Sequence, residues 1–142
     1  TLGSSHVLCG DYGAGNTTKL ANQIIVATNI AAVGEALVLA KKAGLEPQKV
    51  FDAIKGGLAG SNVLNAKGPM MISGNFNPGF RIKLHHKDIR NSMLTGSDLG
   101  VSLPVTSLVQ QIIVSLVNEG KGELDHSAIV NFVEKINDQS IS

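Results

Sequence analysis

The sequence predicts an all-α domain of about six to seven helices around one long central helix. Residues 14–43 contain no proline and only two glycines, and Gly44 follows as a helix stop signal. After the first ten residues no stretch alternates between apolar and polar side chains as a strand would. Apolar residues recur instead at helical spacing between glycines and prolines. The middle of the long helix, 24–39, is apolar or small almost all round, which requires other helices or a partner chain to enclose it.

Five shorter helices are expected after Gly44, each marked by a proline, a polar cap residue or a terminal glycine. Pro47 suits a first helical turn and Ser61 suits an N-cap. The expected spans are 47–55, 63–72, about 80–99, 104–119 and about 126–137.

Composition indicates a folded chain that does not bind nucleic acid. Of the 142 residues 43% are hydrophobic, so a core can form. The net charge of +1 and the scattered Lys and Arg residues do not form a nucleic-acid surface.

Cys9 is the only cysteine, so no internal disulfide can form, and a reducing cytoplasm is expected. No signal peptide is recognisable, and polar residues interrupt the apolar stretch 24–40, which is therefore interpreted as core and not as a membrane span.

The first twelve residues differ from the rest. His6 to Cys9 is a short strand-like run that ends in Gly10-Asp11 and has no partner strand in the sequence. We therefore expect residues 1–12 to be a remnant of a preceding sheet domain or linker, and residues 13–142 to be a helical domain.

A glycine-rich stretch with a lysine, 10–23, carries the first candidate site. It is not a phosphate-binding loop, because three residues separate its last glycine from Lys19, and it lacks the spacing and following strand of a dinucleotide fingerprint. Lys19 lies in the first turns of the long helix, where the helix dipole and any burial would lower the pKa of an ammonium and suit it to proton transfer. Asn22 and Gln23 share its helix face. The same spacing also suits an exposed lysine beside two surface amides.

Phe80, Lys87 and Asp88 form a second candidate site. On a helix, residues 80, 84, 87 and 88 share one face, which would place an aromatic ring above a cation and a carboxylate. An anchoring phenylalanine beside an ordinary ion pair explains the pattern equally. His85 and His86 point apart on a helix, and no further residue completes a metal-binding spacing, so no metal site is expected.

Four stretches together resemble the C-terminal domain of the β-hydroxyacid dehydrogenase family. They are GDYGAGNTTKLANQ (10–23), IKGGLAGSNVLNAKGPM (54–70), NFNPGFRIKLHHKDI (75–89) and LDHSA (124–128). The glycine-rich elbow with its lysine is typical of the whole family. The GGLAGS and PGFRI stretches resemble the branch that reduces tartronate semialdehyde, a small 2-hydroxy-3-oxo acid.

This resemblance implies the helical fold of the 6-phosphogluconate dehydrogenase type and a division of labour. An N-terminal Rossmann domain of the same parent chain would hold most of the NAD or NADP, while this domain covers the nicotinamide and commonly pairs into a homodimer. Lys19 matches the family's catalytic lysine. Of the two amides, Asn22 is favoured to hold substrate, with Gln23 possible. Phe80 and Asp88 match positions that shape the substrate site, and Lys87, together with Phe80, matches those that contact the cofactor.

Other functions stay open at this point. The apolar long helix also suits a dimerisation module without catalytic duty. A related substrate, such as 3-hydroxyisobutyrate, succinic semialdehyde or glyoxylate, is compatible with the same residues. If the resemblance holds, the chain alone should lack turnover, because the nucleotide fingerprint belongs to the other domain.

Overall fold

The computed structural model describes residues 14–142 of the chain. The expected strand at His6 to Cys9 and the proposed remnant at 1–12 lie outside these residues, as does most of the glycine-rich elbow. Within 14–142 the fold is all-α, as predicted.

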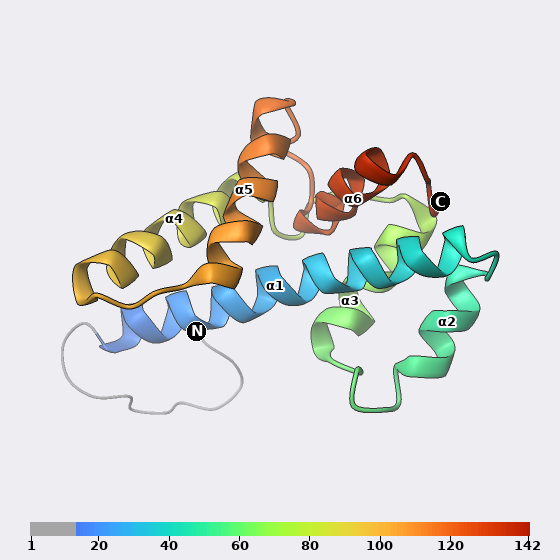
Figure 1. Cartoon of the computed structure of the whole chain (residues 1–142), viewed down its shortest axis with the longest axis horizontal. Coiled ribbons are helices and arrows are strands. Elements are labelled where there is room, and N and C mark those ends of the chain that lie inside the picture. Colours follow the sequence, from blue (N-terminus) through green and yellow to red (C-terminus); the bar gives the residue numbers. More distant parts are fainter. Residues whose placement is uncertain (1–13) are drawn as a thin grey trace.

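One long helix forms the axis of the molecule, and five further α-helices and one 3-10 helix pack along it (Figure 1). The axis is α1 (Ala14–Lys42). The others are α2 (Pro47–Ile54), α3 (Asn62–Ser73), α4 (Ile82–Leu99), α5 (Pro104–Asn118), η1 (His126–Ile129) and α6 (Val130–Asn137). Helices α4 and α5 pack against the N-terminal part of α1, and α2 and α3 pack against its C-terminal part (Figure 1). The chain's C-terminus lies near the end of α1 (Figure 1).

The central position of α1 follows from its apolar middle. Ala27, Ile30 and Leu37 are fully buried, because helices pack against more than one side of α1. By length and composition alone this helix could cross a membrane, yet half of its apolar window is covered within the domain, and core helices of soluble proteins pass the same test.

The helix ends follow the local signals in the sequence. Gly44 has a positive φ of 88° directly after α1, which a residue with a side chain rarely adopts. Pro47 opens α2, and the Ser61 side chain accepts a hydrogen bond from the backbone of Leu64 at the start of α3. Gly68 lets α3 approach α2 closely, because a Cβ there would lie 2.9 Å from the ring of Phe51.

Two predicted helices differ in detail from the structure. The helix expected from about residue 80 begins at Ile82, because the preceding residues run beside the segment before η1. There the backbone N–H groups of Ile82 and Lys83 donate to the carbonyls of Leu124 and Gly122, so tertiary contacts satisfy the first donors of α4. The helix expected over 126–137 is divided into η1 and α6.

A single aliphatic core holds these elements together. Every helix contributes to it, as does Ile141 near the C-terminus. The largest fully buried apolar side chains are Ile30, Leu37, Leu64, Met71, Ile82, Ile89, Ile113, Leu116, Ile129 and Val130. This composition agrees with a chain that has no tryptophan and few aromatic residues. The same packing brings polar groups of α1, α4 and η1 together beside the core.

Candidate active site

Lys19 and Asp88 meet where α1 packs against α4. The Lys19 Nζ lies 3.7 Å from Asp88 Oδ1. The lysine side chain is 56% exposed, whereas the aspartate side chain is 9% exposed. The ammonium is therefore tethered at the surface by a carboxylate that projects from the interior. Residues 14–142 alone do not bury the Lys19 ammonium, as a proton donor shielded from water would require.

Two amides extend this pair into a hydrogen-bonded row. Gln23 Nε2 donates to Asp88 Oδ2 at 2.9 Å, and Asn22 Nδ2 donates to Gln23 Oε1 at 3.0 Å. The orientation of both amides follows from Asp88, because a carboxylate only accepts hydrogen bonds and so fixes which end of Gln23 faces it. Gln23 is buried and uses both ends of its amide inside the protein, whereas Asn22 is exposed. Of the two amides, Asn22 is the one that faces outward.

The aromatic and cationic residues of the second candidate site are not arranged as predicted. Phe80 precedes α4 and is not on its helical face, because the helix begins only at Ile82. Its ring packs against two imidazoles, at 5.5 Å from the centroid of His85 and 5.2 Å from that of His126. Lys87 lies on the exposed side of α4, while the adjacent Asp88 turns inward. Asp88 thus belongs with Lys19, and Phe80 with the histidines.

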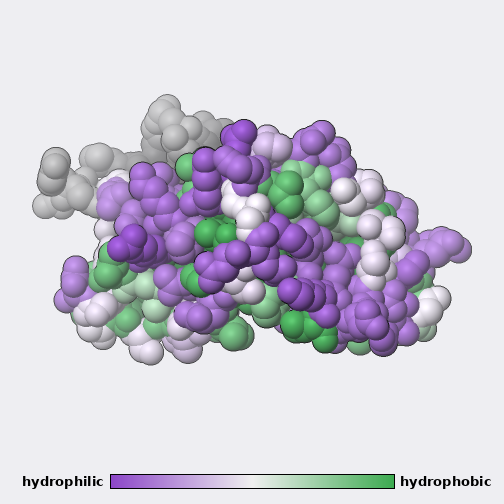
Figure 2. All heavy atoms as spheres, turned by 90° about the horizontal axis from the view of Figure 1, so that it is seen from above, coloured by the Kyte–Doolittle hydropathy of each residue, from purple (hydrophilic) through white to green (hydrophobic). Residues whose placement is uncertain are grey.

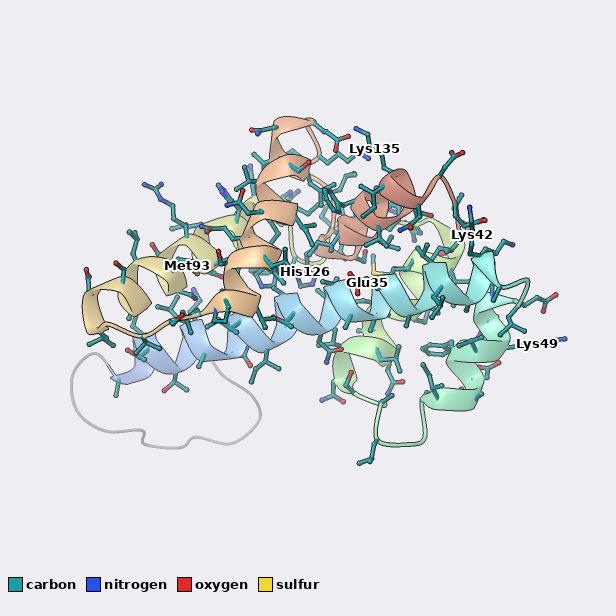
Figure 3. The ribbon with its side chains drawn as sticks, viewed as in Figure 1. Glu35, Lys42, Lys49, Met93, His126 and Lys135 are labelled. Atoms are coloured by element: carbon teal, nitrogen blue, oxygen red, sulfur yellow. The ribbon has the colours of Figure 1, made fainter. Side chains whose placement is uncertain are left out.

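Two buried histidines form a contact that sequence reasoning missed. His85 on α4 and His126 on η1 approach at 2.8 Å between their Nδ1 atoms, and His85 Nε2 lies 3.0 Å from the carbonyl oxygen of Gln23. Figure 3 shows His126 beside the middle of α1. In the sequence, His85 stands out only as a possible metal ligand beside His86. The pairing spans 41 residues of sequence, and no local spacing reveals it.

Both rings are held neutral by their surroundings. Burial is the largest cause and lowers the pKa of His126 to about 3; the nearby His85 and Lys67 act in the same direction, and Asp125 opposes them. Burial also lowers the pKa of His85, against the opposing effects of the Gln23 carbonyl and Asp88. The pair therefore acts at neutral pH as two uncharged rings.

A buried carboxylate anchors the loop that carries Phe80. Asp125 Oδ1 accepts the backbone N–H groups of Gly79 and Phe80, each at 3.0 Å, and Oδ2 accepts that of Ser127 at 2.9 Å. Lys67 reaches both oxygens at 3.2 Å. Burial alone would raise the pKa of Asp125, but the hydrogen bonds from Ser127, Phe80 and Gly79 outweigh it and hold the pKa well below its usual range.

The described part of the chain offers no metal centre. No group of three or more His, Cys, Asp or Glu side chains within 14–142 is placed to hold an ion. The side chains of Lys19, Asn22 and Asp88 themselves can donate a proton and form hydrogen bonds.

Comparison with known proteins shows which family the chain is similar to. Residues 13–133 match a family described as "NAD-binding of NADP-dependent 3-hydroxyisobutyrate dehydrogenase". The chain is 45% identical over 133 residues to 2-hydroxy-3-oxopropionate reductase of Escherichia coli, covering 94% of this chain and 46% of that protein. It is 35% identical over 134 residues to 2-(hydroxymethyl)glutarate dehydrogenase of Eubacterium barkeri, covering 94% and 44%.

Solved structures show the same fold. A 3-hydroxyisobutyrate dehydrogenase of Mycobacterium tuberculosis, solved with L-serine, superposes with a TM-score of 0.83 at 29% identity, covering 89% of this chain and 46% of that one. One from Salmonella typhimurium gives a TM-score of 0.80 at 28% identity, covering 84% and 42%. The chain thus spans less than half the length of each of these proteins.

Proposed function

Because the chain belongs to the β-hydroxyacid dehydrogenase family, we propose that it is the substrate-closing domain of an NAD(P)-dependent reductase. The proposed reaction is reduction of tartronate semialdehyde (2-hydroxy-3-oxopropionate) to glycerate, with Lys19 as general acid. The observation that carries the proposal is the Lys19–Asp88 pair, which Gln23 braces from the interior. The similarity to the Escherichia coli reductase supports this substrate over other semialdehydes.

The proton step assigns a task to each residue of the row. The Lys19 ammonium donates a proton to the carbonyl oxygen of the substrate as that carbonyl becomes an alcohol. Asp88 holds the ammonium at the surface, and Gln23 holds Asp88. Asn22 is exposed beside them and supplies an amide for the hydroxyl or carboxylate of the substrate. Gln23 is less suited to that contact, since both ends of its amide already have partners.

The exposed residues near this row fit the nicotinamide end of a dinucleotide. Phe80 is partly exposed and gives an apolar surface for a planar ring, and Lys87 is an exposed cation for a phosphate or hydroxyl group. When bound, NADH or NADPH supplies the hydride that reduces the carbonyl carbon. Residues 14–142 contain no parallel sheet of the kind that binds the rest of a dinucleotide.

We therefore infer that the complete enzyme adds a dinucleotide-binding domain, and we use the term parent enzyme for the two together. Over half of the Lys19 side chain is exposed in residues 14–142, and a second domain that closes over it would exclude water from the reaction. The test is oxidation of NADH or NADPH in the presence of tartronate semialdehyde. The chain alone should show no turnover. The parent enzyme should reduce tartronate semialdehyde faster than succinic semialdehyde or glyoxylate, and faster than it oxidises 3-hydroxyisobutyrate with NAD or NADP. Steady turnover by the chain alone would contradict the proposal.

A second candidate function, pairing of two copies, is favoured by the exposed apolar surface of α1 and α5. Ile25 is 66% exposed and Leu108 is 66% exposed. A shallow groove of about 420 Å³ runs beside them, lined by Ile24, Ile25, Thr28, Asn29, Ala32, Val105 and Thr106. Residues 20–34 of α1 contain no charged side chain, although part of that stretch faces outward. Figure 2 shows hydrophobic residues gathered in patches among hydrophilic ones on one face of the molecule. A second copy of the chain would cover such a surface.

A further inference from the structure

The proton step leaves the His85–His126 pair without a task, although this buried polar contact lies next to the site. His85 is 0% exposed and His126 is 5% exposed. No metal-binding group includes them among residues 14–142. A core position does not need two imidazoles, since apolar rings of similar size would fill the same space without a desolvation cost.

For two neutral rings, these hydrogen bonds allow only one arrangement of the protons. The Gln23 carbonyl can only accept, so His85 Nε2 must carry a hydrogen and donate it. In a neutral ring His85 Nδ1 is then an acceptor, and the contact at 2.8 Å requires His126 Nδ1 to donate. His85 is therefore the Nε2–H tautomer and His126 the Nδ1–H tautomer. Two charged rings would place two N–H groups face to face.

This arrangement holds Gln23 at two points. His85 and Asp88 lie one turn apart on α4 and both bond to Gln23, the histidine to its backbone and the aspartate to its side chain. The position of α4 against α1 is thus set beside the carboxylate that holds Lys19. The same two rings support Phe80, whose centroid lies within 5.5 Å of each.

Charged groups on the neighbouring elements face the pair from several directions. They are Asp88 on α4, Lys67 on α3 and Asp125 directly before η1. Lys67 and Asp125 are themselves joined. Their opposite charges compensate each other, and the pair stays uncharged between them.

We propose that His85 and His126 are positioning residues, fixed in a single tautomeric arrangement. They hold Phe80 and the Asp88–Lys19 pair at the positions that the reaction requires. The proposal rests on the proposed function for its consequence in catalysis. The tautomers themselves are a property of this chain and can be tested without turnover.

The first test is nitrogen NMR of the chain labelled with ¹⁵N-histidine at pH 7. We expect shifts of the Nε2–H form for His85 and the Nδ1–H form for His126, with a coupling across the hydrogen bond between the two Nδ1 atoms. A charged ring, or the Nδ1–H form of His85, would overturn the proposal. His86 is only partly buried and serves as an internal reference.

The second test separates positioning from packing in the parent enzyme. His85→Phe keeps a ring under Phe80 but removes both hydrogen bonds, and we expect kcat to fall roughly 10- to 100-fold, the scale of a small misplacement. His85→Gln places an amide N–H near the former Nε2 and should recover kcat to within roughly threefold of the parent, because the bond to Gln23 returns. His86→Gln is the matched control and should be unchanged.

The two tests have distinguishable failures. A folded His85→Phe enzyme with unchanged kcat would overturn the positioning role even if the tautomers are as expected. A parent enzyme that retains its kcat when Lys19 is replaced would instead refute the proposed function, whatever the NMR shows.

Discussion

Gln23 and Asp88 lie 65 residues apart in sequence and join through a 2.9 Å hydrogen bond between the amide Nε2 and the carboxylate Oδ2. Because the bond occupies one oxygen of Asp88, the other oxygen is left to face Lys19. The buried Gln23 amide thus determines the orientation of the Asp88 carboxylate toward Lys19. The consequences of this arrangement can be measured.

Removing the Gln23 amide should leave Asp88 less firmly oriented while the reacting group, the Lys19 ammonium, stays in place. Gln23→Leu leaves Asp88 Oδ2 buried without its donor, which costs about 1–3 kcal/mol of stability. In the parent enzyme we expect kcat to fall about tenfold, because Asp88 no longer has one fixed orientation. Urea unfolding and steady-state kinetics measure the two effects. Gln48→Leu is the control, since Gln48 bonds to Asp52 at an exposed position on α2. If Gln23→Leu and Gln48→Leu change the free energy of unfolding and kcat equally, Gln23 does not hold Asp88 in place.

Lys19 should be required for the proton step. Lys19→Ala in the parent enzyme should lower kcat at least ~10²-fold, the usual scale for loss of a general acid. Lys19→Arg should not restore the rate, because a guanidinium does not release its proton. Lys49→Ala removes an exposed lysine from a surface ion pair on α2 and should be neutral. A near-normal rate for Lys19→Ala would remove this residue from the mechanism.

The helices could be predicted from sequence because their signals are local. Gly44, Pro47 and Ser61 act within a turn of their own position, and each marks a boundary found in the structure. The position of Phe80 could not be predicted, because the start of α4 depends on carbonyls of residues 122 and 124, about forty positions away. The resemblance assigns Lys19 and Asp88 to one site, but neither the resemblance nor the spacing predicts their ion pair. The histidine pair had no sequence signal, since the two rings come from different elements.

Asp125 should contribute to stability as an ion. Asp125→Asn would turn an amide N–H toward the donors of Lys67 or Ser127, so we expect a loss of roughly 3 kcal/mol, the scale of breaking a buried ion pair. Asp52→Asn, in an exposed pair with Lys55, should cost almost nothing. Urea unfolding at pH 7 compares them.

The pH dependence of this contribution has a definite sign. The folded state lowers the pKa of Asp125, so its stabilisation is fully present above the unfolded value, about 3.9, and is lost as the pH falls toward the lower folded value. Asp125→Asn should therefore differ most from the natural chain above pH 4 and least in strong acid. A difference that is constant with pH would contradict the assignment.

The apolar surface of α1 and α5 should mediate self-association. Ile25→Lys places a charge in the middle of the exposed patch and should shift sedimentation from dimer to monomer at micromolar concentration. Leu58→Lys is the control, because Leu58 is an even more exposed apolar residue and lies in the loop between α2 and α3, away from the patch. A natural chain that sediments as a monomer would refute pairing through this surface.

The histidine pair should make the fold sensitive to mild acid. The folded state lowers the pKa of His126 to about 3, whereas an unfolded histidine titrates near 6.5, so between these values the unfolded chain binds more protons. Stability is therefore fully present above about pH 6.5 and falls as the pH is lowered, by up to about 1.4 kcal/mol per pH unit for each histidine kept neutral. His85 adds to the slope in the same direction.

His126→Asn isolates one of these contributions. The asparagine Nδ2 can occupy the position of the donating Nδ1, so the bond to His85 is kept while one titrating group is removed. Urea unfolding between pH 4 and 7 should give a slope smaller by up to about 1.4 kcal/mol per pH unit than in the natural chain. His86→Gln should leave the slope almost unchanged, because His86 is only partly buried. If His126→Asn leaves the slope unchanged, His126 takes up a proton in the folded chain, and the neutral pair does not exist.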